Sequence, residues 1–491
     1  MTDTIISTNP LTQTPVGTVY KTNPSTLDKI LKGSVSAQKK WRQLRVKERA
    51  YILKQVRKQL VKKSDQLIAL LSEETGKPLW DSFIEVMTAA EHLKYMCSNA
   101  PLVLSQEKRS PGIFIHKRAY VRYFPHGTAG IISPWNYPLI LTASPVVEAL
   151  LSGNTVVLKP SELTPLTGNK IRQIFIDGGI PKEVFQVIHG FGDTGAALVD
   201  SPMTDIICFT GSVKVGRVIA EACGKQLKPS ILELGGSDPM IVLEDADLDR
   251  SISAAVWGGF SNCGQTCISV ERIYVMDSIA DLFIKGLKKQ TRSLTQSYNP
   301  ERAEIGGMIN NNQKQAVKSF LDEARSEGIT FHLDDKKTTE DSSCFLPPTI
   351  IEIDSSSSSL MQSEIFGPVI TVTRVQSEKE AINKANDTGF GLSASVFSKN
   401  LRKARRVAGQ IRAGSVCIND INSNYICASL PFGGVGVSGI GRVHGPEGLK
   451  AFSQVQAICE DRFGLKKELW WFPIADVTKK GFKKIFKFWY G

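Results

Sequence analysis

Hydrophobic positions along the chain first follow a helical spacing and then a period of two. Residues 24–75 and 80–104 carry apolar side chains at helical spacing, with basic residues on the opposite face. The apolar positions that define the first of these faces are Trp41, Leu44, Leu53, Val56 and Leu60. The stretch 112–125 alternates between polar and apolar residues behind a Ser-Pro-Gly turn signal, so it predicts a β-ribbon.

From residue 127 onward, short apolar runs alternate with amphipathic segments. The runs predict strands at 127–133, 154–160, 184–190 and 204–212. The segments between and after them predict helices at 136–153, ending at Gly153, at 166–179 and at 213–226. The same alternation starts again near residue 231 and runs to about 450, interrupted by polar loops predicted at 334–344 and 355–359. This order predicts an α/β fold with two doubly wound parallel-sheet domains.

Composition narrows the class of protein. With 491 residues, the chain is long enough for two or three domains. Its nine cysteines are scattered and include no C-x-x-C pair, so their spacing fits neither a disulfide framework nor a zinc site. We therefore expect a reducing, cytoplasmic location. The first residues lack a secretory pattern, and no apolar run approaches the roughly 18 residues that span a bilayer.

The net charge of +12 raises the question of nucleic-acid binding. The excess is concentrated in the C-terminal tail and in residues 39–63, where eleven Lys and Arg residues accompany Glu48 alone. No nucleic-acid-binding motif accompanies this charge, so we expect a solvated helix face and no nucleic-acid partner.

Two glycine- and charge-bearing turns indicate a nucleotide site. Gly211, Ser212 and Gly216 fall at a strand-to-helix junction, which either holds a pyrophosphate or is a plain tight turn. Lys159 and Glu162 follow another strand and would project from the carboxyl edge of the sheet. A carboxylate there accepts from ribose hydroxyls and repels a 2′-phosphate, which favours NAD over NADP.

Three further positions carry candidate chemistry but are ambiguous on local sequence. Glu233 precedes two glycines at a strand end and is either salt-bridged or catalytic. Asn136 lies between two prolines and is either a turn former or an oxyanion donor. Cys263 and Cys267 are four residues apart and could be two ligands of a metal site, half of a redox couple, two core residues, or a nucleophile with an inert neighbour. A zinc site is rejected because no His flanks them.

Taken together, these stretches resemble the aldehyde dehydrogenase superfamily over nearly the whole chain. The matching stretches, in family order and spacing, are "PWNYP", "KPSE", "FTGSVKVG", "ELGGSDP", "NCGQTC", "EIFGPV" and "LPFGGVGVSGIGR". The last run is most similar to the class-3 and fatty aldehyde dehydrogenase branch, whereas the N-terminal lead "NPLTQTPVGTVY" is more similar to class-1 and class-2 enzymes.

The resemblance implies roles for individual residues. Cys267 would be the nucleophile that forms a thiohemiacetal and then a thioester, with Cys263 a buried neighbour. Asn136 would hold the oxyanion, and Glu233 would be the general base for the hydrolytic water. The implied cofactor is NAD, with NADP as a second candidate, and no metal is expected. The implied cofactor-binding residues are Trp135, Lys159, Glu162, Gly192, Gly211, Ser212, Gly216, Glu364 and Phe366.

The resemblance also implies a division of the chain and a homodimer or homotetramer. Residues 1–103 and 126–234 would bind NAD(P), and residues 235–449 would form the catalytic domain. Oligomerisation elements would comprise residues 104–125 and 450–476, ahead of a basic amphipathic tail at 477–491.

The residues at the implied substrate tunnel are apolar except for one hydroxyl and include no arginine. They are Tyr137, Leu141, Ile268, Ile426 and Phe432. They predict medium- or long-chain, fatty or apocarotenoid-type aldehydes. The alternatives are small polar aldehydes such as semialdehydes, a CoA-dependent acyl-transferring enzyme and a non-catalytic binding protein on the same fold.

The tail places apolar residues on one side of a helix and lysines on the other. The apolar positions are Phe482, Ile485, Phe486 and Trp489, and the basic ones are Lys479, Lys480, Lys483, Lys484 and Lys487. This pattern predicts peripheral contact with a membrane surface, and the alternative is packing against a partner subunit.

Overall fold

The computed structural model describes residues 4–334, 344–354, 359–464 and 466–491. The polar loops expected at 334–344 and 355–359 lie almost entirely outside the described residues. The chain divides into two compact units. The larger one runs to Leu104 and resumes over Phe124–Gln454, and the smaller one comprises Ser105–Tyr123 and Val455–Gly491.

The larger unit opens with a hairpin of β1 (Thr4–Thr8) and β2 (Pro15–Tyr20), followed by helices. The helices are α1 (Pro24–Trp41), α2 (Val46–Lys62), α3 (Ser64–Thr75) and α4 (Leu79–Val103). The predicted helical region 24–75 is therefore interrupted. After this break α2 starts with a capping box, in which the Arg45 N–H donates to Glu48 Oε2. The Trp41 indole and the Arg49 guanidinium, on either side of the break, both donate to carbonyls at the end of α5 (Ile140–Ser152). Gly76, at a φ of 70°, ends α3 in the left-handed conformation that glycine favours.

A six-stranded sheet has the order β17-β9-β8-β5-β6-β7. Its strands are β5 (Thr128–Ile132), β6 (Thr155–Lys159), β7 (Phe185–Val187), β8 (Ile206–Thr210), β9 (Ser230–Glu233) and β17 (Gly439–Ile440). The pairings from β9 to β7 are parallel, and only β17 runs antiparallel to its neighbour. The prediction of a parallel sheet in this part of the chain is confirmed.

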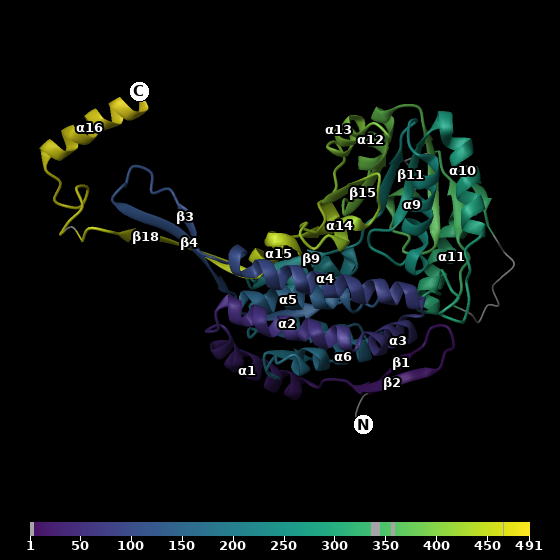
Figure 1. Cartoon of the computed structure of the whole chain (residues 1–491), viewed down its shortest axis with the longest axis horizontal. Helices are drawn as coiled ribbons and strands as arrows, with labels where there is room; N and C mark the ends of the chain where they lie inside the picture. The colour runs from purple at the N-terminus through teal and green to yellow at the C-terminus, as the bar shows by residue number, and fades with distance from the viewer. Residues whose placement is uncertain (1–3, 335–343, 355–358, 465) are drawn as a thin grey trace. The chain divides into compact units, whose positions relative to one another are not determined.

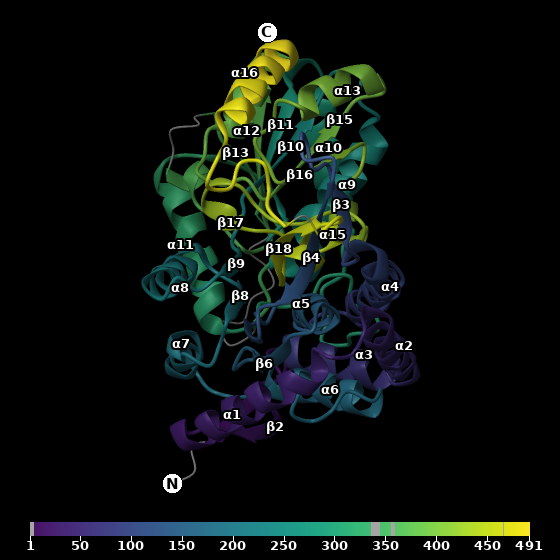
Figure 2. The same cartoon turned by 90° about the vertical axis from the view of Figure 1, so that its left-hand side faces the viewer.

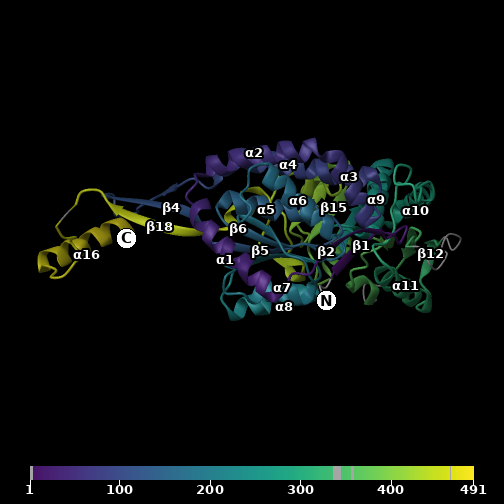
Figure 3. The same ribbon diagram turned by 90° about the horizontal axis from the view of Figure 1, so that it is seen from below.

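Helices cover both faces of this sheet. They are α5 (Ile140–Ser152), α6 (Pro165–Asp177), α7 (Gly192–Asp200) and α8 (Val213–Lys225). A helix from a later part of the chain, α15 (Gly445–Ala451), packs against α4 and α5. Figure 3 shows α5 and α6 on one face and α1, α7 and α8 on the other. The helix predicted from residue 136 begins only at Ile140, so Asn136 lies in the loop after β5, while Gly153 ends the helix as expected.

A seven-stranded sheet has the order β12-β13-β14-β11-β10-β15-β16, parallel except for β12. Its strands are β10 (Asp238–Val242), β11 (Val270–Met276), β12 (Thr330–Leu333), β13 (Thr349–Glu352), β14 (Val369–Val375), β15 (Ser393–Phe397) and β16 (Ser415–Ile418). Its helices are α9 (Leu248–Phe260), α10 (Asp277–Arg292), α11 (Asn311–Ser326), α12 (Glu378–Asn386), α13 (Leu401–Ala408) and α14 (Ser423–Ile426). Figure 1 shows α10 and α12 on opposite sides of β11.

The smaller unit contains a three-stranded sheet and a C-terminal helix. Its strands are β3 (Glu107–Arg109), β4 (Lys117–Pro125) and β18 (Ser453–Asp461), with β4 in the middle (Figure 2). The ribbon predicted over 112–125 is wrong at its start, because the strand begins at Lys117 and the preceding residues form the turn from β3. The tail forms α16 (Asp476–Tyr490), as its spacing predicts. None of the helices in the described part of the chain has the length and apolarity needed to cross a bilayer.

Candidate active site

Four neighbouring parallel strands bring their carboxyl ends to one edge of the six-stranded sheet. β5 leads into Trp135 and Asn136, β6 ends at Lys159, and β8 leads into Gly211 and Ser212. β9 ends at Glu233, the last residue of the strand. Open α/β sheets bind ligands at this edge, so the fold gathers residues that are up to about a hundred positions apart in sequence.

A cavity of about 540 Å³ opens at this edge. It contacts all three candidate catalytic residues, Asn136, Glu233 and Cys267. The candidate cofactor residues that line it are Trp135, Gly211, Ser212, Glu364 and Phe366. The seven-stranded sheet therefore contributes Cys267, Glu364 and Phe366 from the loops before β11 and β14.

The other candidate cofactor residues lie outside the cavity lining. Lys159 Nζ is 3.4 Å from Glu162 Oε2 and donates to the Pro160 carbonyl at 3.1 Å. Gly192 is the first residue of α7, the helix whose Gly195 lies against the Lys159 side chain. Gly216 packs α8 against β9, since a Cβ there would meet the Leu234 side chain at 2.4 Å.

A second, narrow cavity of about 90 Å³ reaches Cys267. It is mostly apolar, and among the described residues that line it there is no lysine or arginine. Its lining residues are Ile84, Glu85, Thr88, Tyr137, Ile140, Leu141, Trp257, Ser261, Thr266, Cys267, Ile268, Asn422, Tyr425 and Ile426. Of the expected tunnel residues, Phe432 alone is missing here and lines the larger cavity instead. The Cys267 side chain thus lies where the two cavities meet.

The loop before Cys267 has a strained backbone. Asn262, Cys263 and Gly264 all have positive φ, at 50°, 58° and 70°. Asn262 Nδ2 donates to the Asn136 and Gln265 carbonyls at 3.0 and 3.2 Å, which holds the loop against β5. Non-glycine residues adopt this conformation at a cost of order 1–3 kcal/mol, and such strain is concentrated at functional sites.

The two cysteines of the loop have different environments. Cys263 is fully buried in the core of the seven-stranded sheet, whereas Cys267 is only partly buried and lines both cavities. Burial and the nearby carboxyls, of which Asp238 contributes most, raise the pKa of the Cys267 thiol. The pair is therefore no metal corner in this fold, because the two side chains face different surroundings.

Asn136 is held by residues that local sequence reasoning missed. Its carbonyl accepts from Lys77 Nζ at 2.7 Å, and Lys77 also pairs with Glu85 Oε2 at 2.8 Å. Both side chains of this ion pair are completely buried. Asn136 Nδ2 donates to the Gln265 carbonyl at 3.1 Å; a primary amide has a second proton, which remains for a ligand. The sequence signal for this support was weak: Lys77 stands between Gly76 and Pro78, just ahead of a predicted helix.

Glu233 has no hydrogen-bond partner for either carboxylate oxygen among the described residues. Burial and the Glu148 carboxyl raise its pKa well above the usual range, and Arg442 opposes the shift. The pKa of the Glu364 carboxyl is also raised, to about 8, by burial and by the nearby Glu271 carboxyl. Buried carboxyls with raised pKa values in a cavity are typical of general acid–base chemistry.

The loop that carries Glu364 and Phe366 is held in place by hydrogen bonds to a side chain of β11. Glu271 on β11 accepts the backbone N–H groups of Ile365 and Phe366, at 3.1 and 2.9 Å. Glu364 Oε1 accepts from the Gly236 N–H at 3.2 Å, and the Phe366 ring meets Trp135 edge-on at 5.6 Å between centroids. A Cβ at Gly235 would be 2.1 Å from Glu364, so glycine is required for this close approach.

Comparisons with known proteins agree on one family. The family model described as "Aldehyde dehydrogenase family" matches residues 1–458. A 4,4′-diapolycopene aldehyde oxidase from Methylomonas sp is 36% identical over 99% of this chain and 92% of its own length. A "putative succinate-semialdehyde dehydrogenase" from Mycobacterium tuberculosis, NADP(+)-dependent by its name, is 33% identical over 97% of this chain and 93% of its own length.

Solved structures give the same picture. An NAD-dependent aldehyde dehydrogenase from Sinorhizobium meliloti superposes with a TM-score of 0.91 at 32% identity, covering 96% of this chain and 93% of its own. A betaine aldehyde dehydrogenase from Staphylococcus aureus in complex with NAD+ has a TM-score of 0.90 at 30% identity, covering 96% and 94%.

Proposed function

Because this chain belongs to the aldehyde dehydrogenase family, we propose that it oxidises lipophilic aldehydes to carboxylic acids through a thioester on Cys267. It is an NAD(P)-dependent aldehyde dehydrogenase. The observation that carries the substrate proposal is the narrow apolar cavity that ends at this cysteine.

Cys267 performs the covalent chemistry in this proposal. Its thiolate attacks the aldehyde carbon, and the carbonyl π electrons move to oxygen to give a thiohemiacetal anion. The Asn136 amide and the Cys267 backbone N–H stabilise that oxyanion. The position of the thiol at the meeting point of the two cavities supports this role, since aldehyde and cofactor then approach from different sides.

Glu233 removes a proton from the water that hydrolyses the thioester. The water oxygen bonds to the acyl carbon, the C–S bond breaks, and the carboxylic acid leaves as the thiolate is regenerated. Its two unpartnered oxygens in the larger cavity support this role, because no group among the described residues competes for them.

A bound NAD would supply the acceptor for the hydride of the thiohemiacetal carbon. The helix N-terminus of α8 with Ser212 as its cap fits a pyrophosphate, and Glu364 fits a ribose hydroxyl. Glu162, paired with Lys159 beyond the cavity lining, fits the adenosine ribose and disfavours a 2′-phosphate. We therefore propose NAD as the preferred cofactor and NADP as a weaker one.

Two observations favour lipophilic aldehydes over small semialdehydes. A carboxylate-bearing substrate needs a cation near its far end, and the narrow cavity has no lysine or arginine in its described lining. Its one acidic residue, Glu85, is already paired with Lys77. The relatives do not separate the two classes, because one at 36% identity is named for 4,4′-diapolycopene aldehyde and one at 33% for succinate semialdehyde.

We further propose that α16 contacts membrane surfaces peripherally, where lipophilic aldehydes reside. None of its residues is buried, and its aromatic side chains are at least 38% exposed. Lysines and large apolar side chains on one helix are typical of interfacial binding.

A panel of aldehydes tests the substrate proposal. With NAD in excess, kcat/KM should rise along the straight-chain series by up to roughly fourfold per methylene while the chain fills the apolar cavity. Succinate semialdehyde should be a poor substrate. Ile426→Arg should depress turnover of long chains and improve the semialdehyde, with Ile426→Leu as the matched control. Preference of the wild-type enzyme for succinate semialdehyde would overturn the proposal.

A further inference from the structure

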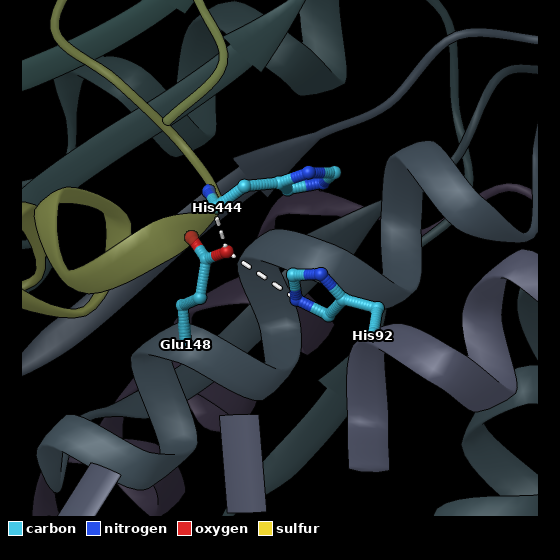
Figure 4. Close-up of side chains that lie close together, drawn as sticks. All are labelled: His92, Glu148 and His444. Carbon is cyan, nitrogen blue, oxygen red and sulfur yellow. Dashed lines mark hydrogen bonds and ion pairs between the residues drawn. The ribbon is translucent and has the colours of Figure 1, made fainter. Parts of the chain in front are cut away.

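A cluster of three metal-ligating side chains lies buried behind the larger cavity. His92 comes from α4, Glu148 from α5, and His444 from the residue just before α15 (Figure 4). Their exposed fractions are 1%, 0% and 1%. The cluster reaches the cavity wall through Ser144, whose Oγ lies 3.2 Å from His444 Nε2.

The candidate ligand atoms of the three residues lie near one another. Glu148 Oε1 accepts the His444 backbone N–H at 2.9 Å, and His92 Nε2 lies 3.3 Å from the same oxygen. One ligand atom from each of the three residues falls within 4.8 Å of the other two. Figure 4 shows the His92 ring facing the Glu148 carboxylate, which is joined to His444 through the backbone N–H, while the His444 ring lies beside the His92 ring.

The Glu148 carboxylate is only partly satisfied by the described residues. Among the described residues, Glu148 Oε2 has no hydrogen-bond partner, whereas His92 bonds to the Ser144 backbone and His444 to the Tyr425 backbone. A buried polar group left in this condition costs about 1–3 kcal/mol. Such groups in a native protein normally bind an ordered water or an ion.

The lack of a lysine or arginine beside Glu148 among the described residues favours an ion over water. The contact with His92 is the one ion pair that Glu148 makes in the described part of the chain, and no lysine or arginine pairs with it. A second His and acidic cluster, formed by His116, Asp461 and Glu468, differs in this respect, because Lys117 pairs with both of its carboxylates. The cluster around Glu148 thus has room for a cation beside its carboxyl group, while the second cluster already has Lys117.

We propose that His92, Glu148 and His444 bind a divalent transition-metal ion, with zinc as the first candidate. Two imidazoles and one carboxylate form a donor set that suits zinc. The ion would crosslink α4, α5 and the segment entering α15. It would thereby stabilise the packing of these elements next to Ser144, which lines the cavity. None of the three residues lines that cavity, so the role is structural and independent of which aldehyde is oxidised.

The metal content of the full-length protein tests this site. After removal of any histidine tag, loading with zinc and gel filtration, inductively coupled plasma mass spectrometry should find one zinc ion per chain. Zinc K-edge absorption should show nitrogen and oxygen ligands at about 2.0–2.1 Å and no sulfur near 2.3 Å. A wild-type protein without tightly held metal, or with sulfur-ligated metal, would overturn the proposal, and this measurement needs no variant.

Variants then locate the ion. His92→Gln and His444→Gln should each lose the metal, and a chelator should lower Tm in the wild type but not in these variants. Two controls should keep the metal: Cys267→Ser, which removes the reactive thiol, and His189→Gln, a buried histidine that pairs with Asn169. Metal that disappears with Cys267 and persists without His92 would refute the assignment.

Discussion

Cys263 and Cys267 lie four residues apart in one loop and meet different surroundings. Cys267→Ser should abolish NADH formation while NAD binding persists, because a hydroxyl lacks the reactivity of a thiolate. Cys263→Ala should retain most of the activity, with some loss of stability from the cavity it leaves in the core. NADH formation and cofactor titration on both variants check this. The reverse pattern would assign the nucleophile to Cys263.

Glu233 should set the pH dependence of turnover. Burial raises the pKa of this carboxyl, so it is protonated at lower pH and gains its base form as pH rises. The raised pKa of the Cys267 thiol acts in the same direction. We therefore expect steady-state turnover to climb from neutral toward alkaline pH.

The variant Glu233→Gln separates the contribution of Glu233 to turnover from that of Cys267. The variant should release a burst of NADH and then turn over slowly, because the thioester forms but its water lacks a base. Stopped-flow measurement of the burst checks this, and Glu91→Gln on the exposed face of α4 is the control. Loss of the burst itself would place Glu233 before hydride transfer.

Lys77 is expected to position the oxyanion donor. Lys77→Met removes the donor to the Asn136 carbonyl and leaves Glu85 buried without its partner, which costs about 3–5 kcal/mol of stability. The double variant Lys77→Met/Glu85→Gln should recover most of that stability but not kcat, because the Asn136 backbone is still unsupported. Thermal melting and kcat on both variants separate the effects. Full recovery of kcat in the double variant would make the pair purely structural.

At the scale of elements, α8 offers two glycines with opposite expectations. A Cβ at Gly216 would press on Leu234, which lines the larger cavity, whereas a Cβ at Gly224 meets nothing within 4 Å. Gly224→Ala should stabilise the protein by about 0.4–1 kcal/mol. Gly216→Ala should displace α8 and weaken NAD binding several-fold. Calorimetric titration with NAD and thermal melting check both; equal NAD affinities would show that α8 tolerates the contact.

The elements themselves were largely readable from the sequence pattern. The strands β5, β6 and β8 and the helices α6 and α8 lie where the apolar runs and the helical spacing predict them. The break after α1 had one local signal, the capping box of Arg45 and Glu48 at the start of α2. The bonds from Trp41 and Arg49 to the distant end of α5 have no local signal.

At the scale of the whole molecule, the tail should connect the enzyme to lipid surfaces. Each lysine near an acidic membrane contributes about 1 kcal/mol, and each large apolar side chain at most about 1.5–3 kcal/mol. Deleting residues 477–491 should abolish binding to anionic vesicles and lower turnover of long-chain aldehydes, with short-chain turnover unchanged. Vesicle flotation at rising salt and a chain-length series check this.

A matched control comes from another basic helix. Replacing Lys285, Lys288, Lys289 and Arg292 of α10 with glutamine removes four positive charges, against five in the tail, and should leave vesicle binding intact. If the truncation instead dissociates a homodimer or homotetramer, or lowers activity equally for all chain lengths, the tail is an assembly element.

The sequence by itself determined the α/β class, most element positions and the family, because these depend on local spacing and on collinear motifs. Only the tertiary structure decided that Cys267 lies between a wide and a narrow cavity, that Lys77 and Glu85 support Asn136, and that His92, Glu148 and His444 lie near one another. The physical reason is that partners in these contacts lie tens to hundreds of residues apart. A side chain's burial and its unsatisfied atoms exist only once such segments have packed together.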